Sequence, residues 1–74
     1  MIIIESIQET CGGCPMIWEG KTTEGQDFYI RFRWGLLRLV VNKEVIFAEQ
    51  ISDGLDGIMS LDEALIHLNE HIRW

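Results

Sequence analysis

Two cysteines and two histidines are the residues whose types and spacing could hold a metal ion. Cys11 and Cys14 have the C-x-x-C spacing of a metal knuckle or a redox pair, and His67 and His71 stand four residues apart, on one face of a predicted helix. Two thiolates and two imidazoles form the ligand set of a structural zinc site. However, the two pairs are separated by far more than the roughly dozen residues of a compact zinc finger. Zinc binding is therefore an alternative to semi-buried loop cysteines and histidines that border an apolar stripe.

Other arrangements that could do chemistry are incomplete. A thioredoxin-like cysteine pair is usually followed by a helix N-terminus, whereas Pro15 and strand-like residues follow this one. No third orienting group or oxyanion donor accompanies a cysteine and histidine pair. Gly12 and Gly13 lack the lysine and the strand-to-helix context of a phosphate-binding loop. We therefore expect a protein that is not an enzyme and that uses no cofactor, apart from the zinc alternative.

A second group combines one aromatic ring with three basic side chains. Tyr29, Arg31, Arg33 and Arg38 have the ingredients of a sheet platform that stacks and neutralises single-stranded nucleic acid. A net charge of −6 disfavours phosphate-backbone binding by the chain as a whole. The more common explanation of such residues is cation–π contact or ion pairing with acids on neighbouring strands, here Glu19, Glu44 or Glu49.

The charge is distributed unevenly along the chain. Residues 28–43 contain four basic residues and no acid, whereas the segments on either side are acidic. The acids of residues 44–63 either form a solvated face or imitate a phosphate backbone that occupies a basic groove of a partner. Trp74 at the chain end is a candidate anchor at an interface. The residues that we predict to contact a partner are Tyr29, Arg31, Arg33, Glu49, Asp53, Asp56 and Trp74.

The elements that must position these residues centre on residues 27–41, which read DFYIRFRWGLLRLVV. Alternation with a period of two predicts a strand with one face in a core and one wetter face. We expect Phe28, Ile30, Phe32 and Trp34 to be buried beneath a C-terminal helix, with the arginines facing outward.

The rest of the chain predicts more strands and one helix. Strands are expected at residues 2–9, 16–22, 27–34, 36–41 and 44–50, with turns at 23–26, Gly35 and Asn42-Lys43. Ser60 and Glu63 match a capping box at the start of a helix over residues 60–73. Its apolar stripe consists of Leu61, Leu65, Leu68 and Ile72. The predicted fold is a single α+β domain, residues 1–74, with a mostly antiparallel sheet of four to five strands packed by one C-terminal helix.

Length and composition place limits on the setting of the protein. A chain of 74 residues that is 47% hydrophobic buries only about 60–65% of its unfolded surface, which favours a homodimer. The apolar start at residues 1–4 is followed by Glu5 and is too short for a signal peptide or a membrane span. We therefore expect a cytoplasmic protein without a membrane partner.

Part of the sequence resembles a known pattern. Cys14-Pro15, Trp18-Glu19-Gly20 and the run YIRFRWG at residues 29–35 look like the pattern C-P-x-x-W-E-G followed by Y-I-R-x-R-W-G in small uncharacterised proteins of bacteria and their mobile elements. The similarity spans about half the chain, and its turn is Glu24-Gly25 where the pattern has Asp-Gly. The resemblance implies a hairpin and no particular activity.

The functional expectation combines these observations. Small size, high acidity, surplus aromatic residues and the lack of a catalytic constellation favour a non-enzymatic protein-binding module. Such a module could be a phage or mobile-element product that inhibits a host protein, for example a host defence component. The alternative is a structural domain stabilised by zinc at Cys11, Cys14, His67 and His71.

Overall fold

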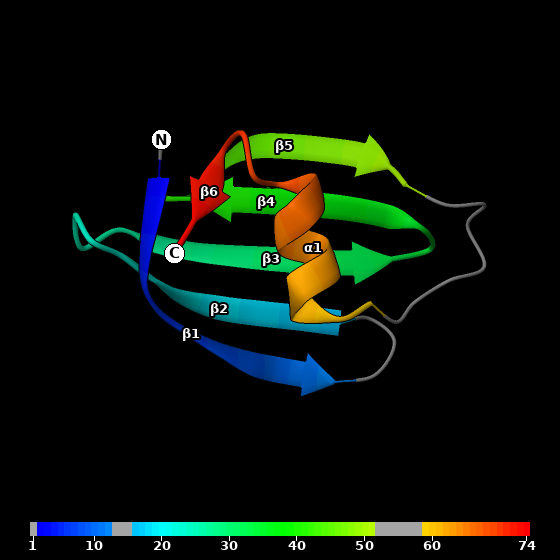
Figure 1. The fold of residues 1–74 in the computed structure, drawn as a ribbon, viewed down its shortest axis with the longest axis horizontal. Helices are drawn as coiled ribbons and strands as arrows, with labels where there is room; N and C mark the ends of the chain where they lie inside the picture. Colours follow the sequence, from blue (N-terminus) through cyan, green and yellow to red (C-terminus); the bar gives the residue numbers. More distant parts are fainter. Residues whose placement is uncertain (1, 13–15, 52–58) are drawn as a thin grey trace.

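The computed structural model describes residues 2–12, 16–51 and 59–74, which form one curled sheet of six strands and a single short helix. The sheet order is β5-β4-β3-β2-β1-β6, and every neighbouring pair is antiparallel except β1 and β6. The elements are β1 (Ile2–Gly12), β2 (Met16–Thr22), β3 (Asp27–Arg33), β4 (Leu36–Val41), β5 (Glu44–Gln50), α1 (Leu61–His67) and β6 (Ile72–Arg73) (Figure 1). The predicted α+β class agrees with this architecture in outline, with six strands in place of four or five.

The hairpins of the sheet are closed by tight turns. Trp34 and Gly35, between β3 and β4, have φ values of 55° and 75°, and Asn42 and Lys43, between β4 and β5, have values of 51° and 67°. Positive φ at both central residues is typical of type I′ turns, whose twist matches that of the flanking strands. The predicted turns at Gly35 and at Asn42-Lys43 are therefore confirmed.

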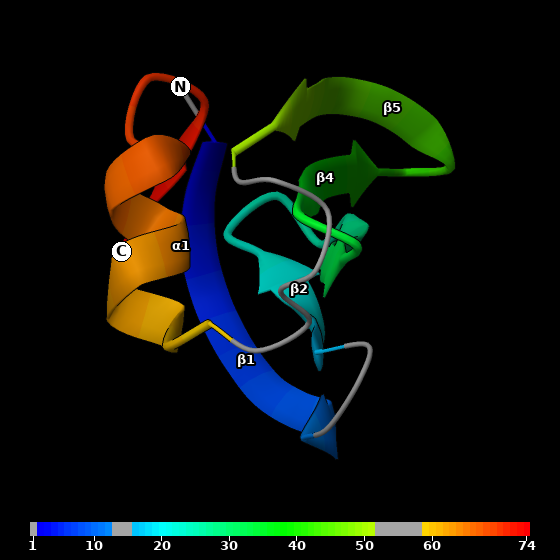
Figure 2. The ribbon, with the colours of Figure 1, turned by 90° about the vertical axis from the view of Figure 1, so that its right-hand side faces the viewer.

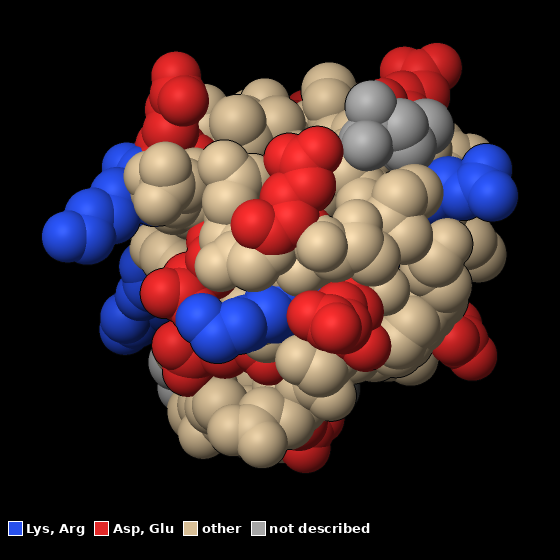
Figure 3. Space-filling model, turned by 90° about the vertical axis from the view of Figure 1, so that its left-hand side faces the viewer, with Lys and Arg blue, Asp and Glu red and all other residues tan. Residues whose placement is uncertain are grey.

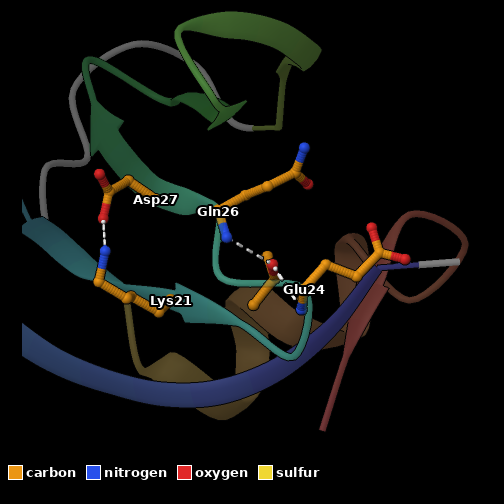
Figure 4. Close-up of polar contacts among 5 residues, drawn as sticks. Lys21, Glu24, Gln26 and Asp27 are labelled. Carbon is orange, nitrogen blue, oxygen red and sulfur yellow. Dashed lines mark hydrogen bonds and ion pairs between the residues drawn. The ribbon is translucent and has the colours of Figure 1, made fainter.

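The turn between β2 and β3 is organised by the buried side chain of Thr22. Its Oγ1 accepts hydrogen bonds from the backbone N–H groups of Gln26, at 3.1 Å, and Glu24, at 3.3 Å. At the base of the turn, Lys21 Nζ lies 2.7 Å from Asp27 Oδ1 (Figure 4). The threonine hydroxyl satisfies two backbone donors that the turn would otherwise leave without a protein partner.

The strand β1 bends across the end of the sheet. Its pairing with β2 shifts register between Ile4 and Ser6 and again between Glu9 and Cys11, and such irregularities increase bend and twist. Gly20 permits close approach of the two strands, because a Cβ there would overlap the carbonyl oxygen of Ser6. Figure 2 shows the resulting curve of β1 from one side of the molecule to the other.

The curl brings the two ends of the strand order towards each other. Phe47 of the edge strand β5 lies with its ring centroid 5.4 Å from that of His71, which directly precedes β6 at the other edge. The carbonyl oxygen of His71 accepts a hydrogen bond from the N–H of Ile2 at 3.0 Å. The described part of the chain is therefore closer to a partly closed barrel than to a flat sheet.

The hydrophobic core lies on the inner face of this curl. Trp18, Ile30 and Leu39 pair across β2, β3 and β4 and are almost fully buried. The helix and the C-terminal strand add Ala64, Leu68 and Ile72 to the same cluster. The other buried members of the cluster are Ile4, Met16, Phe28, Phe32, Leu37, Val41 and Met59.

One predicted core residue is not in the core. Phe28, Ile30 and Phe32 are buried as the alternation predicts, but Trp34 is 57% exposed. β3 ends at Arg33, and Trp34 is the first residue of the turn, where the alternation of an extended chain no longer applies. The prediction of a buried Trp34 is therefore wrong.

The helix begins as the sequence predicts. Ser60 is its N-cap, and the Ser60 hydroxyl accepts a hydrogen bond from the N–H of Glu63 at 3.1 Å. Asp62 and Glu63 lie in the first turn, where negative charge suits the helix dipole. The capping prediction is confirmed for the serine-to-backbone bond.

The helix ends earlier than predicted. α1 stops at His67, and the chain then turns so that Ile72 and Arg73 pair in parallel with Ile2 and Ile3. A parallel strand needs an extended backbone, and this pairing also buries Ile72 completely. Ile72, which the helical spacing assigned to the apolar stripe of the helix, therefore lies in a strand. The prediction of a helix to residue 73 is wrong.

Candidate functional site on the outer face of the sheet

The outer face of β3 carries three of the predicted partner-contacting residues. Tyr29, Arg31 and Arg33 alternate with the buried residues of the same strand and therefore project from the opposite face. Tyr29 and Arg31 are half-buried, and Arg33 is exposed. The strand places these side chains side by side with no loop between them.

The neighbouring strands complete a small hollow on this face. Arg31, Arg33, Trp34, Leu36 and Arg38 line a space of about 120 Å³, which we call the arginine–tryptophan hollow. Arg31 and Arg38 are direct partners across β3 and β4, and Arg33 is opposite Leu36. A pair of residues from each strand and one from the connecting turn thus surround the hollow.

The arginines of the hollow have no acidic partner within the described residues. The one ion pair found there, between Lys21 and Asp27, lies at the β2–β3 turn. Glu19 is opposite Tyr29 and lines an adjacent hollow with Ile17, Tyr29 and Arg31, but it forms no ion pair with Arg31. Of the two explanations expected for these residues, a cation–π contact is found at Arg33 and Trp34, whereas an ion pair to Glu19, Glu44 or Glu49 is not found among the described residues.

Trp34 combines exposure with an unfavourable backbone conformation. Glycine and asparagine are the usual residues at positive φ in such turns, and a bulky aromatic residue there is uncommon. The turn is held from the side by Gln50 Nε2, which donates to Trp34 O at 2.8 Å, and by Ile51 N, which donates to Gly35 O at 2.7 Å. The exposed indole is therefore carried by a turn that two hydrogen bonds hold in place.

The guanidinium of Arg33 lies against this indole. Its Cζ is 5.3 Å from the centroid of the Trp34 ring, within the range of a cation–π contact. This contact orders a long and flexible side chain beside the hollow. The sequence pattern placed Arg38 with the other basic residues, but Trp34 was predicted to be buried, whereas it lies beside Arg33. The Trp-Gly pair between two predicted strands, at a position suited to a two-residue turn, was the signal for it.

The hollow differs in charge from the molecule as a whole. The chain has a net charge of −6, and acidic side chains are spread over the view in Figure 3. Basic side chains appear near the centre and at both edges of that view, whereas the hollow itself is lined by three arginines. A local positive site on an acidic protein attracts anions at short range, whereas the net charge repels large polyanions.

Two other predicted partner-contacting residues that the structure describes, Glu49 and Trp74, do not line the hollow. Glu49 lies on the edge strand β5 opposite the buried Leu37, and therefore on the other face of the sheet. Trp74 is 59% exposed and follows β6, at the far end of the strand order. Asp53 and Asp56 lie outside the described residues. Among the described members of this set, Tyr29, Arg31 and Arg33 share one face of β3.

The predicted zinc ligands are distributed over different parts of the fold. Cys11 lies near the end of β1, whereas His71 is hydrogen bonded to the start of that strand at Ile2. His67 is the last residue of α1, and Cys14 lies outside the described residues. Among residues 2–12, 16–51 and 59–74 no three acidic, cysteine or histidine residues are grouped as metal ligands would be.

A larger and more open depression lies at the junction of β1, β2 and β3. Ser6, Ile7, Glu19, Gly20 and the Lys21–Asp27 pair are among the residues that line its volume of about 580 Å³. It follows the register shift of β1, and its basic residue is already paired with Asp27. It therefore has less unsatisfied charge than the arginine–tryptophan hollow.

Comparison of the chain with protein-family models, curated proteins and solved structures finds no match. Within the described residues, no helix is long and apolar enough to cross a membrane.

Proposed function

We propose that this protein is a non-enzymatic binding module that holds an acidic segment of a partner protein against the arginine–tryptophan hollow. The observation that carries the proposal is Trp34. It is exposed at positive φ beside three arginines that have no acidic partner within the described residues. Backbone strain of this kind persists where the surrounding structure enforces it and is concentrated at functional sites.

The residue types of the hollow agree with this role. Tryptophan and arginine are enriched among the interface residues that contribute most to binding energy. The half-buried Tyr29 and Ile17 extend the same face beyond the arginines. An acidic partner segment would neutralise the arginines and cover the indole in one step.

We also propose the arrangement expected from the sequence, in which α1 covers the inner face of the sheet. The outer face is then left for the partner. Complete burial of Ala64 and Leu68, in one cluster with residues of β2, β3 and β4, supports this arrangement. Figure 1 shows α1 in front of these strands.

The biological setting is proposed from the resemblance to small proteins of bacteria and their mobile elements. A phage or mobile-element product of this kind would act by occupying an acidic surface of a host protein and so inhibiting it. Its positive hollow would recognise the partner, while its own acids would repel nucleic acid.

A peptide-display selection against the immobilised 74-residue chain tests the function. We expect the selected peptides to be rich in Asp and Glu and to lose binding to the variants Arg31→Gln and Trp34→Asn. Arg73→Gln is the matched control, because it removes one exposed arginine from β6 at the sheet edge. Peptides that bind all four proteins equally would show that another surface is used.

A further inference from the structure

We propose that the arginine–tryptophan hollow receives a phosphoryl group, as a phosphate monoester carried on a side chain of the partner protein. This inference rests on the proposed function, because it specifies which anionic group the same face binds. It also predicts that partner binding is controlled by phosphorylation of the partner.

The number of cationic groups favours a phosphoryl group over a carboxylate. Arg31, Arg33 and Arg38 all line the hollow, and no ion pair within the described residues neutralises them. A phosphate monoester carries a charge of about −1.5 to −2 at neutral pH and three strong acceptor oxygens. A carboxylate supplies a single charge and two oxygens. Guanidinium groups also match phosphate oxygens with two parallel hydrogen bonds.

The size of the hollow limits how much of the ligand enters. Its volume of about 120 Å³ is below the roughly 300–1,000 Å³ of sites that enclose a whole small molecule. The hollow therefore suits one tetrahedral group, with the remainder of the ligand outside. The exposed indole of Trp34 and the adjacent hollow at Ile17 and Tyr29 are the surfaces on which that remainder would rest.

The surroundings discriminate against nucleic acid. Glu19 lines the adjacent hollow together with Arg31, so a polyanion that extended along this face would meet its negative charge. The net charge of −6 repels a polyanion further. An isolated phosphoryl group on a protein avoids both penalties.

The sheet orders the arginine side chains before the ligand binds. Arg31 and Arg38 are half-buried on paired strands, and Arg33 lies against the Trp34 ring. Arginines ordered in this way lose less conformational freedom on binding than side chains that are free in solvent. Without an anion, the direct pairing of Arg31 with Arg38 leaves two like charges opposed, and a phosphoryl group between them would remove that repulsion.

Titrations of the full chain with small probes test the proposal. Phenyl phosphate and benzoate would be added separately at equal ionic strength, while the Trp34 indole N–H and the arginine Nε–H signals are followed by NMR. We expect phenyl phosphate to bind about tenfold more tightly than benzoate and to shift the signals of Trp34, Arg31 and Arg38. Its affinity should increase between about pH 5 and pH 7, as the ester loses its second proton near pH 6.

Variants connect the binding to the hollow. Arg38→Gln should weaken phenyl phosphate binding about tenfold, and the control Arg73→Gln should leave it unchanged. Thermal unfolding of both variants verifies that the fold is retained. Equal binding of the two probes, or an Arg38→Gln variant that binds as the wild type does, would overturn the proposal.

Two further outcomes separate this inference from the proposed function. If acidic peptides bind through Trp34 and Arg31 but phenyl phosphate does not bind, the phosphoryl assignment is wrong and the binding function remains. If a single-stranded oligonucleotide binds more tightly than a phosphopeptide of equal charge, the assignment of the phosphoryl group to a partner protein is wrong.

Discussion

Arg31 and Arg38 lie directly opposite each other on the neighbouring strands β3 and β4, and no acid within the described residues forms an ion pair with either. Like charges directly opposed in a sheet destabilise the fold. The repulsion between these two arginines lowers the stability of the fold. The proposed site can therefore be tested by measuring stability as well as binding.

Replacement of Arg38 by glutamine should stabilise the isolated protein. The change removes the opposed charge, and we expect the free energy of unfolding to increase by about 0.2–1 kcal/mol. Urea unfolding at low salt measures the difference, which should shrink as salt screens the repulsion. Arg73→Gln serves as the control for general charge effects. A loss of stability in Arg38→Gln would mean that the arginine stem contributes packing that exceeds the repulsion.

Replacement of Trp34 by asparagine should separate stability from binding. Asparagine tolerates positive φ, and Asn-Gly is the preferred pair for this turn, so we expect stability to increase by about 0.5–1 kcal/mol. Binding of acidic peptides should be lost. Trp34→Ala is the matched variant, because it removes the ring while keeping a residue that disfavours positive φ. If Trp34→Asn is less stable than Trp34→Ala, the strain argument fails.

Thr22 should be required for the β2–β3 turn. Thr22→Val keeps the size of the side chain but removes the oxygen that accepts from the N–H groups of Glu24 and Gln26. We expect a loss of about 1–3 kcal/mol in chemical unfolding, because two backbone donors lose their protein partner. Thr22→Ser keeps the hydroxyl and should lose less. Equal effects of the two variants would show that the methyl group, and not the hydrogen bonds, stabilises the turn.

The contribution of the helix to the core can be measured at Leu68. This side chain is fully buried at the end of α1, and Leu68→Ala should cost about 2–5 kcal/mol by leaving a cavity. Ile66 of the same helix is 68% exposed and provides the control, since Ile66→Ala should change stability by less than about 0.5 kcal/mol. Similar losses at both positions would contradict the proposed cover of the inner face by α1.

If the predicted homodimer forms, we expect the edge strand β5 to be its interface. Val45 and Ile46 are exposed on this strand, which stands at the end of the strand order and contains no lysine or proline. Edge strands present backbone groups that can pair with a strand of another chain. We expect sedimentation equilibrium to show a dimer that Ile46→Lys converts to a monomer. Ile66→Lys, an equal change on α1, should leave the dimer intact; a monomeric wild type would refute the prediction.

Local patterns were enough to predict much of the fold. The alternation in residues 27–33, the turn at Asn42-Lys43 and the serine cap at residue 60 depend on near neighbours in the chain, and the structure confirms all three. The same holds for the placement of Tyr29, Arg31 and Arg33 on one face, because a strand alternates its side chains whatever its neighbours are.

Long-range pairing decided the remainder. Helical spacing continued through Ile72, but the N-terminal strand offered that residue an edge to pair with, and the parallel pairing replaced the last helical turn. The hollow also depends on two features of the pairing between β3 and β4. The register places Arg31 opposite Arg38, and the connecting turn exposes Trp34. Sequence alone determined which side chains each strand presents, whereas only the tertiary structure determined which strands lie side by side, because strand register is set by contacts between residues that are distant in the chain.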